Sequence, residues 1–315
     1  MVNLCARFFM IAPPRRPLTP EEKDKIRSLG LRHFIFFKEH FSDRAFWENF
    51  KKELQALSPP GLWAVDQEGG PVTRITPPLF PALKAPLSLA REEEPEQAVR
   101  EAALLCARNL KKLGLNFNLA PVLDLAGEGA PPFLRGRTFG EDPSLTARLG
   151  VTYLKAFKQV GLYCCGKHFP GLGGVEVDPH LRLPVKERLD ERDLIPFKAA
   201  VMAGLPAMMT THLLVPSFSA DPVTYSPKFL RFLREELGFR GVVLTDDLFM
   251  GGALAGIDLE EAVLKAFLAG HDLMLLCGDF TKSLAALAAF CEEVQQSPAL
   301  REEMLARLSS RLLPL

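Results

Sequence analysis

Eight short apolar runs, most of them followed by a segment with helical character, constrain this chain more than any other feature. The runs are continuously hydrophobic and do not alternate, as expected for parallel strands that are covered on both faces. They occupy residues 6–11, 33–37, 62–65, 115–120, 162–166, 207–211, 242–245 and 272–277. Repeated strand–helix units in 315 residues predict an α/β fold, a (β/α)₈ TIM barrel. We expect residues 1–315 to form a single catalytic domain.

The segments between the runs carry start and stop signals for helices. Thr19-Pro20 followed by Glu22 predicts a capping box, and Gly30 can end that helix. Ser42 is expected to cap a helix over 43–57, and a further helix over 96–113 is expected to end at Gly114. Other predicted starts are Asp142-Pro143, Ser226-Pro227 and Asp258.

An open doubly wound sheet is the alternative to a barrel. The chain has neither a GxGxxG motif nor a P-loop after its first apolar run, and no change in composition marks a second domain. Residues 1–12 are apolar, but they lack a basic start and contain Arg7. We therefore expect a first strand there, not a signal peptide, and no later run predicts a membrane span.

The charge balance limits the classes of partner. Lysine plus arginine and aspartate plus glutamate both number 38, so no overall basic field favours nucleic acid or an anionic membrane surface. A small molecule is the expected partner. The six cysteines show no CxxC spacing, which favours free buried thiols and a reducing, cytoplasmic location. The sequence gives no prediction of oligomeric state.

Residues 166–184 form the densest group of titratable and glycine residues in the chain. Lys167, His168, Asp178 and His180 lie there among four glycines. Because glycines and prolines disfavour helix and strand interiors, we predict a loop between a strand and a helix, where catalytic side chains are commonly found. Asp178 and His180 are close enough for the carboxylate to fix the tautomer of the imidazole.

Further polar residues follow other predicted strands. Asp66, Asp124, His212 and the pair Asp246 and Asp247 all stand where an apolar run ends. In a barrel these ends meet at one mouth. One acid of the pair can cap the following turn, which leaves the other free for catalysis. No HExxH or similar spacing supports a metal site, and we expect neither a metal nor a cofactor.

With these residues assembled, the chain resembles the family 3 glycoside hydrolases. The resemblance is strongest to their single-domain bacterial β-N-acetylglucosaminidase branch, which works in peptidoglycan recycling. Six motifs occur in the family's order: Asp66-Gln67-Glu68-Gly69-Gly70, the run 118–124, the run 137–143, Lys167-His168-Phe169-Pro170-Gly171, Asp178-x-His180, and the run 245–250. The Asp-x-His pair is the most specific, since it distinguishes this branch from β-glucosidases.

The resemblance implies a retaining hydrolase of terminal N-acetylglucosaminyl glycosides, including muropeptides. It implies that Asp246 is the nucleophile and that His180 is the acid/base, oriented by Asp178. The residues implied to hold the sugar are Asp66, Arg74, Arg137, Lys167 and His168. A neutral imidazole would not repel an anion as a carboxylate does, so a phosphorylase is an alternative. A β-glucosidase and a sugar-binding barrel that has lost catalysis are further alternatives.

This chain departs from the family pattern in its catalytic loop. Leu172-Gly173-Gly174 stands where the family usually has His-Gly-Asp, Pro179 where it has serine, and Pro71 where a basic residue is common. We expect residues 172–174 to act as a hinge on which His180 swings toward Asp246.

Overall fold

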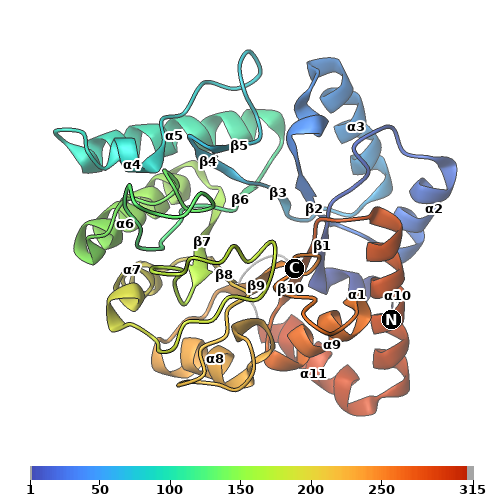
Figure 1. The fold of residues 1–315 in the computed structure, drawn as a ribbon. Helices are drawn as coiled ribbons and strands as arrows, with labels where there is room; N and C mark the ends of the chain where they lie inside the picture. Colours follow the sequence, from blue (N-terminus) through green and yellow to red (C-terminus); the bar gives the residue numbers. More distant parts are fainter. Residues whose placement is uncertain (1, 311–315) are drawn as a thin grey trace.

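A computed structural model describes residues 2–310 of the chain and contains a closed parallel barrel (Figure 1). The order of strands around the barrel is β1-β10-β9-β8-β7-β6-β3-β2. Their bounds are Phe9–Ile11 for β1, His33–Phe36 for β2, Trp63–Val65 for β3, Phe117–Asn118 for β6, Tyr163–Phe169 for β7, Ala207–Thr210 for β8, Val242–Asp247 for β9 and Leu273–Leu276 for β10. The predicted (β/α)₈ architecture is therefore confirmed, with a strand at each of the predicted runs.

Helices surround the strands on the outside of the barrel (Figure 1). The α-helices are α1 (Val2–Cys5), α2 (Pro20–Leu29), α3 (Arg44–Leu57), α4 (Pro86–Leu89), α5 (Pro95–Leu113), α6 (Pro143–Val160), α7 (Glu191–Met202), α8 (Pro227–Arg231), α9 (Leu259–Ala269), α10 (Phe280–Gln296) and α11 (Pro298–Ser310). Short 3₁₀ turns η1 (Ala6–Phe8), η2 (Lys38–Phe41) and η3 (Val223–Tyr225), a π-helical turn η4 (Phe232–Glu236) and a hairpin of β4 (Gln67–Gly69) with β5 (Val72–Thr73) complete the elements. Among residues 2–310, none of these helices combines the length and apolar character that a membrane span requires.

The apolar core has two layers. Side chains such as Met10, Ile35, Met209, Leu244 and Leu275 belong to one buried cluster contributed by the barrel strands. A larger cluster joins the strands to the surrounding helices. Interior side chains fill a barrel of this size, so it is a packed core and not a pore.

Most predicted helix signals match the structure. The Thr19 hydroxyl accepts from the Glu22 amide and completes a capping box, while Gly30 ends α2 with a φ of 68°. Helix α3 begins one residue later than expected because the Asp43 carboxylate, not Ser42, accepts the hydrogen bond from the Phe46 amide, at 2.7 Å. Serine and aspartate are both preferred residues at the N-cap of a helix.

Two predictions about the strands are wrong in extent. Residues 2–8 are helical, and β1 begins only at Phe9; Met1 lies outside the described residues. An apolar run suits a buried helix as well as a strand, and Phe8 packs edge-on against Phe267 of α9. Strand β7 continues to Phe169, beyond the predicted end at Gly166, because the Lys167 amide donates to the Pro121 carbonyl at 3.1 Å.

Candidate active site

The eight side chains that the resemblance implies for the site surround one cavity of about 540 Å³, whereas Asp124 and His212, expected at the same mouth, do not line it. Its floor includes Ile35, Leu119, Met209 and Leu275 from the barrel interior. Its walls include all eight predicted site residues, namely Asp66, Arg74, Arg137, Lys167, His168, Asp178, His180 and Asp246. These residues come from segments up to 180 positions apart, and the barrel brings them together at the carboxyl ends of its strands.

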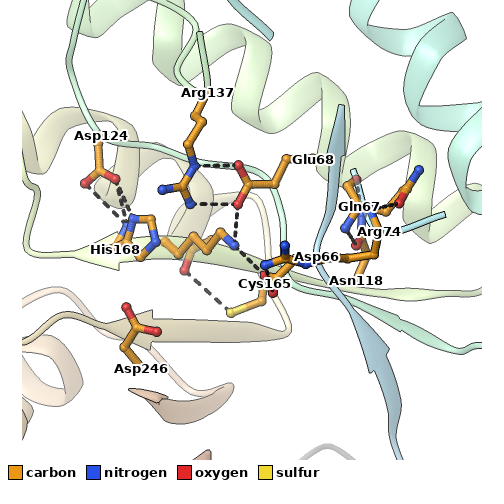
Figure 2. Close-up of polar contacts among 12 residues, drawn as sticks. Asp66, Gln67, Glu68, Arg74, Asn118, Asp124, Arg137, Cys165, His168 and Asp246 are labelled. Atoms are coloured by element: carbon orange, nitrogen blue, oxygen red, sulfur yellow. Dashed lines mark hydrogen bonds and ion pairs between the residues drawn. The ribbon is translucent and has the colours of Figure 1, made fainter. Parts of the chain in front are cut away.

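A buried ion network forms one wall (Figure 2). The Glu68 carboxylate accepts two hydrogen bonds from the Arg137 guanidinium, each of 2.8 Å. The Lys167 ammonium lies 2.6 Å from the same carboxylate and 2.8 Å from Asp66. The side chains of Glu68 and Lys167 are no more than 2% exposed. Removal of Glu68 would leave the largely buried guanidinium of Arg137 without its carboxylate partner, which is costly.

Each charged group in this network shifts the pKa of its partners so that their charged forms are favoured. Burial alone would raise the pKa of Glu68, but the adjacent Lys167 and Arg137 outweigh it and hold that pKa well below its ordinary value. Burial disfavours the charged form of Arg137 and Lys167 as well, yet the carboxylates of Glu68 and Asp66 raise the pKa of both cations. Glu68, Arg137 and Lys167 are therefore charged near neutral pH.

The hairpin after β3 aims Asp66 and Arg74 at the cavity. The Gln67 side-chain oxygen accepts from the amides of Arg74 and Ile75, both at 3.0 Å, and the Gln67 amide donates to the side chain of Asn118 in β6. These bonds fix the hairpin against the barrel. Arg74 then lies 3.5 Å from the Asp66 carboxylate, with about a third of its side chain exposed.

His168 is held by a buried acid, Asp124, in the loop that follows β6 (Figure 2). Its Nδ1 lies 2.6 Å from the Asp124 carboxylate, whose side chain is fully buried. The same carboxylate accepts from the Leu172 amide at 2.8 Å. The pairing of β7 with β8 shifts register between Gly166 and Phe169, and such irregularities redirect side chains. Both Lys167 and His168 consequently line the cavity.

The two acids at the end of β9 have different surroundings. Asp247 accepts from the amides of Phe249, at 3.1 Å, and Cys277, at 2.9 Å. Asp246 accepts only from the neighbouring Asp247 amide in the described structure, and its carboxylate faces the imidazole of His168 (Figure 2). Of the two alternatives that the sequence left open, Asp247 therefore builds the turn and Asp246 remains available.

The pKa values of Asp246 and Asp247 also differ. Burial raises the pKa of Asp247 to about 6. Burial would also raise the pKa of Asp246, but nearby His168 and His212 outweigh it, so that this pKa lies below its ordinary value. Asp246 is thus an ionised carboxylate over the range in which Asp247 titrates.

The Asp178–His180 pair lies in the loop between β7 and α7. The Asp178 Oδ1 atom is 2.8 Å from His180 Nδ1 and also accepts from the His180 amide at 2.9 Å. This contact directs an Nδ1 proton to the carboxylate and leaves Nε2 free. The His180 side chain is 63% exposed, and it borders the same cavity as Asp246.

The beginning of this loop is firmly held. Leu172 is 2% exposed, and its amide donates to Asp124. Lys186 donates to the Gly173 carbonyl and forms an ion pair with Asp193, while a Cβ at Gly173 would lie 2.5 Å from an Asp193 oxygen. These contacts argue against the expected hinge at Leu172 and Gly173, which are the fixed base of the loop.

Sequence reasoning named Glu68 only as a member of a motif, and it placed Asp124 at the mouth of the barrel without giving it a role. Each follows a predicted strand, and Glu68 is two positions from Asp66. The usable signal was the number of cations: Lys167, Arg137 and Arg74 had only Asp66 as a predicted partner. Buried cations need counter-charges. In the described part of the chain, no group of three or more His, Cys, Asp or Glu side chains is arranged to hold a metal ion.

Comparison with known proteins gives consistent results. The model for the glycosyl hydrolase family 3 N terminal domain matches residues 25–311. A β-hexosaminidase of Nitrosospira multiformis is 36% identical over 305 residues, which cover 93% of this chain and 86% of that protein. A β-hexosaminidase of Thiobacillus denitrificans is 37% identical over 254 residues, covering 77% of this chain and 70% of that protein.

Two solved structures are similar over almost the whole chain. A family 3 β-N-acetylglucosaminidase from Paenibacillus sp. str. FPU-7 has a TM-score of 0.88 and 29% identity over 98% of this chain, and the chain spans 61% of its length. NagZ from Neisseria gonorrhoeae, solved in complex with N-trifluoroacetyl-D-glucosamine, has a TM-score of 0.77 and 27% identity, covering 97% of this chain and 98% of that protein.

Proposed function

The chain belongs to glycosyl hydrolase family 3, and we propose that it is a retaining β-N-acetylhexosaminidase that releases terminal β-linked N-acetylglucosamine. The observation that carries this proposal is that Asp246 and the Asp178–His180 pair border the same cavity. One is a carboxylate with a lowered pKa, and the other is an imidazole with a free Nε2. They have the chemistry of a nucleophile and of an acid/base.

In the first step, Asp246 attacks the anomeric carbon while the bond to the leaving oxygen breaks. His180, as imidazolium, gives its Nε2 proton to that oxygen, and the aglycone leaves as an alcohol. The product is a glycosyl ester of Asp246 and a neutral imidazole. The Asp178 carboxylate, 2.8 Å from Nδ1, stabilises the protonated imidazole and fixes its tautomer.

In the second step, neutral His180 removes a proton from water, which attacks the same carbon and releases Asp246. Two inversions at one carbon give net retention. A neutral base beside the intermediate would also admit phosphate as the acceptor, because an imidazole does not repel an anion as a carboxylate would. Phosphorolysis is therefore the second candidate, and it is supported by the use of histidine at this position.

The ion network is suited to hold the non-reducing sugar. Asp66 and Lys167 can accept from and donate to sugar hydroxyls in fixed directions, since each is already oriented by the 2.8 Å contact between them. The complex of the Neisseria relative with an N-acylated glucosamine supports the same class of sugar for this chain. Arg137 and His168 complete the proposed sugar site.

We further propose muropeptides as substrates and a cytoplasmic role in peptidoglycan recycling. At the rim, Arg15 and Arg74 flank the Phe37 ring at 4.5 and 5.3 Å from its centroid. Both cations border the cavity, and cations there suit a carboxylate on the aglycone. The resemblance to the recycling branch of the family supports this assignment.

A panel of three assays tests the function. We expect nitrophenol release from the β-N-acetylglucosaminide to exceed release from the β-glucoside, and we expect the sugar product to be free N-acetylglucosamine. Sugar 1-phosphate formed in phosphate buffer would identify a phosphorylase. Faster release from the glucoside would identify a β-glucosidase. Binding of N-acetylglucosamine without turnover of either substrate would contradict both enzymatic assignments.

A further inference from the structure

The loop that carries His180 is docked on the turn that follows Asp247. The Gly251 amide donates to the His180 carbonyl at 3.0 Å, and the Gly252 amide donates to the Pro179 carbonyl at 2.9 Å. Two adjacent donors therefore hold two adjacent acceptors. The contact joins the loop after β7, which carries the proposed acid/base, to the loop after β9, the strand that carries the proposed nucleophile.

The donor side of this contact requires residues without side chains. A Cβ on Gly251 would lie 2.3 Å from the Leu181 carbonyl oxygen, and a Cβ on Gly252 would lie 2.8 Å from the Pro179 oxygen. Neither glycine has a positive φ that would itself demand glycine. Close approach of the loop backbone is thus the reason that side chains do not fit here.

The acceptor side is a compact turn built by Asp178. The Asp178 carbonyl accepts from the amides of Leu181, at 3.0 Å, and Arg182, at 3.3 Å. Its carboxylate binds the amide and the ring of His180. These bonds fix the carbonyls of Pro179 and His180 relative to the imidazole, so whatever holds the carbonyls also sets the position of the ring.

Pro179 is the one buried residue of the turn formed by residues 178–182. The Leu181 side chain is 79% exposed, and His180 and Arg182 are exposed as well. On the opposite side, the turn that presents the glycines is built by Asp247, whose carboxylate accepts from the Phe249 amide and whose carbonyl accepts from the Met250 amide. The second acid of the pair thereby contributes to the docking surface.

We propose that Gly251 and Gly252 are positioning residues that dock the Asp178–His180 turn and set the acid/base relative to Asp246. We call these two amides and the two carbonyls that they bind the glycine latch. The proposal rests on the proposed function in assigning His180 as acid/base, but the docking itself does not. When the latch is displaced, the imidazole loses its position, although the sugar site, which lies on β7 and on other loops, is unchanged.

The test uses Gly251→Ala, with Gly252→Ala as a milder second variant. Gly129→Ala is the matched control, because a Cβ there meets nothing within 4 Å and its φ is not positive. Cleavage by trypsin after the exposed Arg182 reports the position of the loop without reference to activity. We expect cleavage to be faster in Gly251→Ala than in the wild type, by roughly tenfold, and unchanged in the control.

The kinetic readout separates positioning from general damage. We expect Gly251→Ala to lower kcat roughly tenfold or more for an alkyl N-acetylglucosaminide, whose poor leaving group needs the acid. A dinitrophenyl glycoside should lose much less, and inhibition by N-acetylglucosamine should change less than threefold, roughly. Gly252→Ala should show the same pattern with smaller changes.

Two results would overturn the proposal. One is wild-type tryptic cleavage at Arg182 in both glycine variants, which would show that the amides do not hold the loop. The other is an equal loss of kcat on both leaving groups, which would show that the latch does not set the acid/base. If the wild type hydrolysed no N-acetylglucosaminide, the proposed function would fail, and tryptic cleavage would still decide whether the latch holds the loop.

Discussion

The ammonium of Lys167 lies 2.6 Å from the carboxylate of Glu68, and neither side chain is more than 2% exposed. Glu68 also binds Arg137, so one acid pairs with two cations in the wall of the cavity. The geometry of the proposed sugar site therefore depends on a residue that need not contact the sugar through its own oxygens.

Replacement of Glu68 by glutamine should destabilise the protein strongly. The change leaves Lys167 and Arg137 with less negative charge in a buried place, and breaking such a pair costs about 3–5 kcal/mol. Chemical denaturation would measure the loss, and N-acetylglucosamine binding should weaken at the same time. Glu128→Gln is the matched control, since Glu128 pairs with Arg91 on the surface, where loss of an ion pair should leave stability nearly unchanged. Equal stabilities of the two variants would contradict this account.

Asp247→Asn should change the pH dependence of stability. Burial raises the pKa of Asp247 to about 6 from an ordinary 3.8, so the folded protein holds this proton more tightly than the unfolded chain. The stabilisation from this group is fully present below pH 3.8 and is lost as the pH rises through about 6.

Asparagine removes this titration but keeps an oxygen for the amides of Phe249 and Cys277. The free energy of unfolding of the wild type, minus that of Asp247→Asn, should fall between pH 4 and pH 6.5 by roughly 3 kcal/mol at most. Denaturation curves at several pH values measure the difference. A difference that stays constant, or that rises with pH, would be inconsistent with a raised pKa at Asp247.

The barrel itself could be predicted because its signal is repeated. Each strand of the barrel is a local apolar run, and a barrel tolerates errors of a few residues at any strand end. The errors lie where tertiary contacts decide between local alternatives. Residues 6–8 are as suitable for a 3₁₀ turn as for a strand, and Lys167 to Phe169 become a strand because backbone groups of neighbouring strands pair with them.

The sequence predicted which residues line the site, but it did not predict which of them form ion pairs and hydrogen bonds with one another. Motifs at strand ends named the eight side chains that line the cavity. The pairing of Glu68 with Lys167 and Arg137, and of Asp124 with His168, was not predicted, because partners are recognised by their distance in space, which a sequence does not contain. The glycine latch escaped for the same reason, since Gly251 and the His180 carbonyl are 71 positions apart.

His180→Ala should affect substrates according to their leaving groups. Without the acid, alkyl N-acetylglucosaminides should be cleaved roughly 10²–10⁴-fold more slowly, while dinitrophenyl glycosides, which need no protonation, should form the intermediate at a nearly unchanged rate. Single-turnover kinetics on both substrates measure the contrast. Arg182→Ala, in the same exposed turn, should leave both rates close to those of the wild type. Equal losses on the two substrates would exclude His180 as the general acid.

Identification of the carboxylate that bonds to the sugar tests the central claim most directly. A fluorinated N-acetylglucosaminyl fluoride, which forms the covalent intermediate faster than water can release it, would label the nucleophile for peptide mass spectrometry. We predict the label on Asp246, which accepts only the Asp247 amide among the described residues. A label on Asp247, or release of product with inversion and no labelled peptide, would contradict the account.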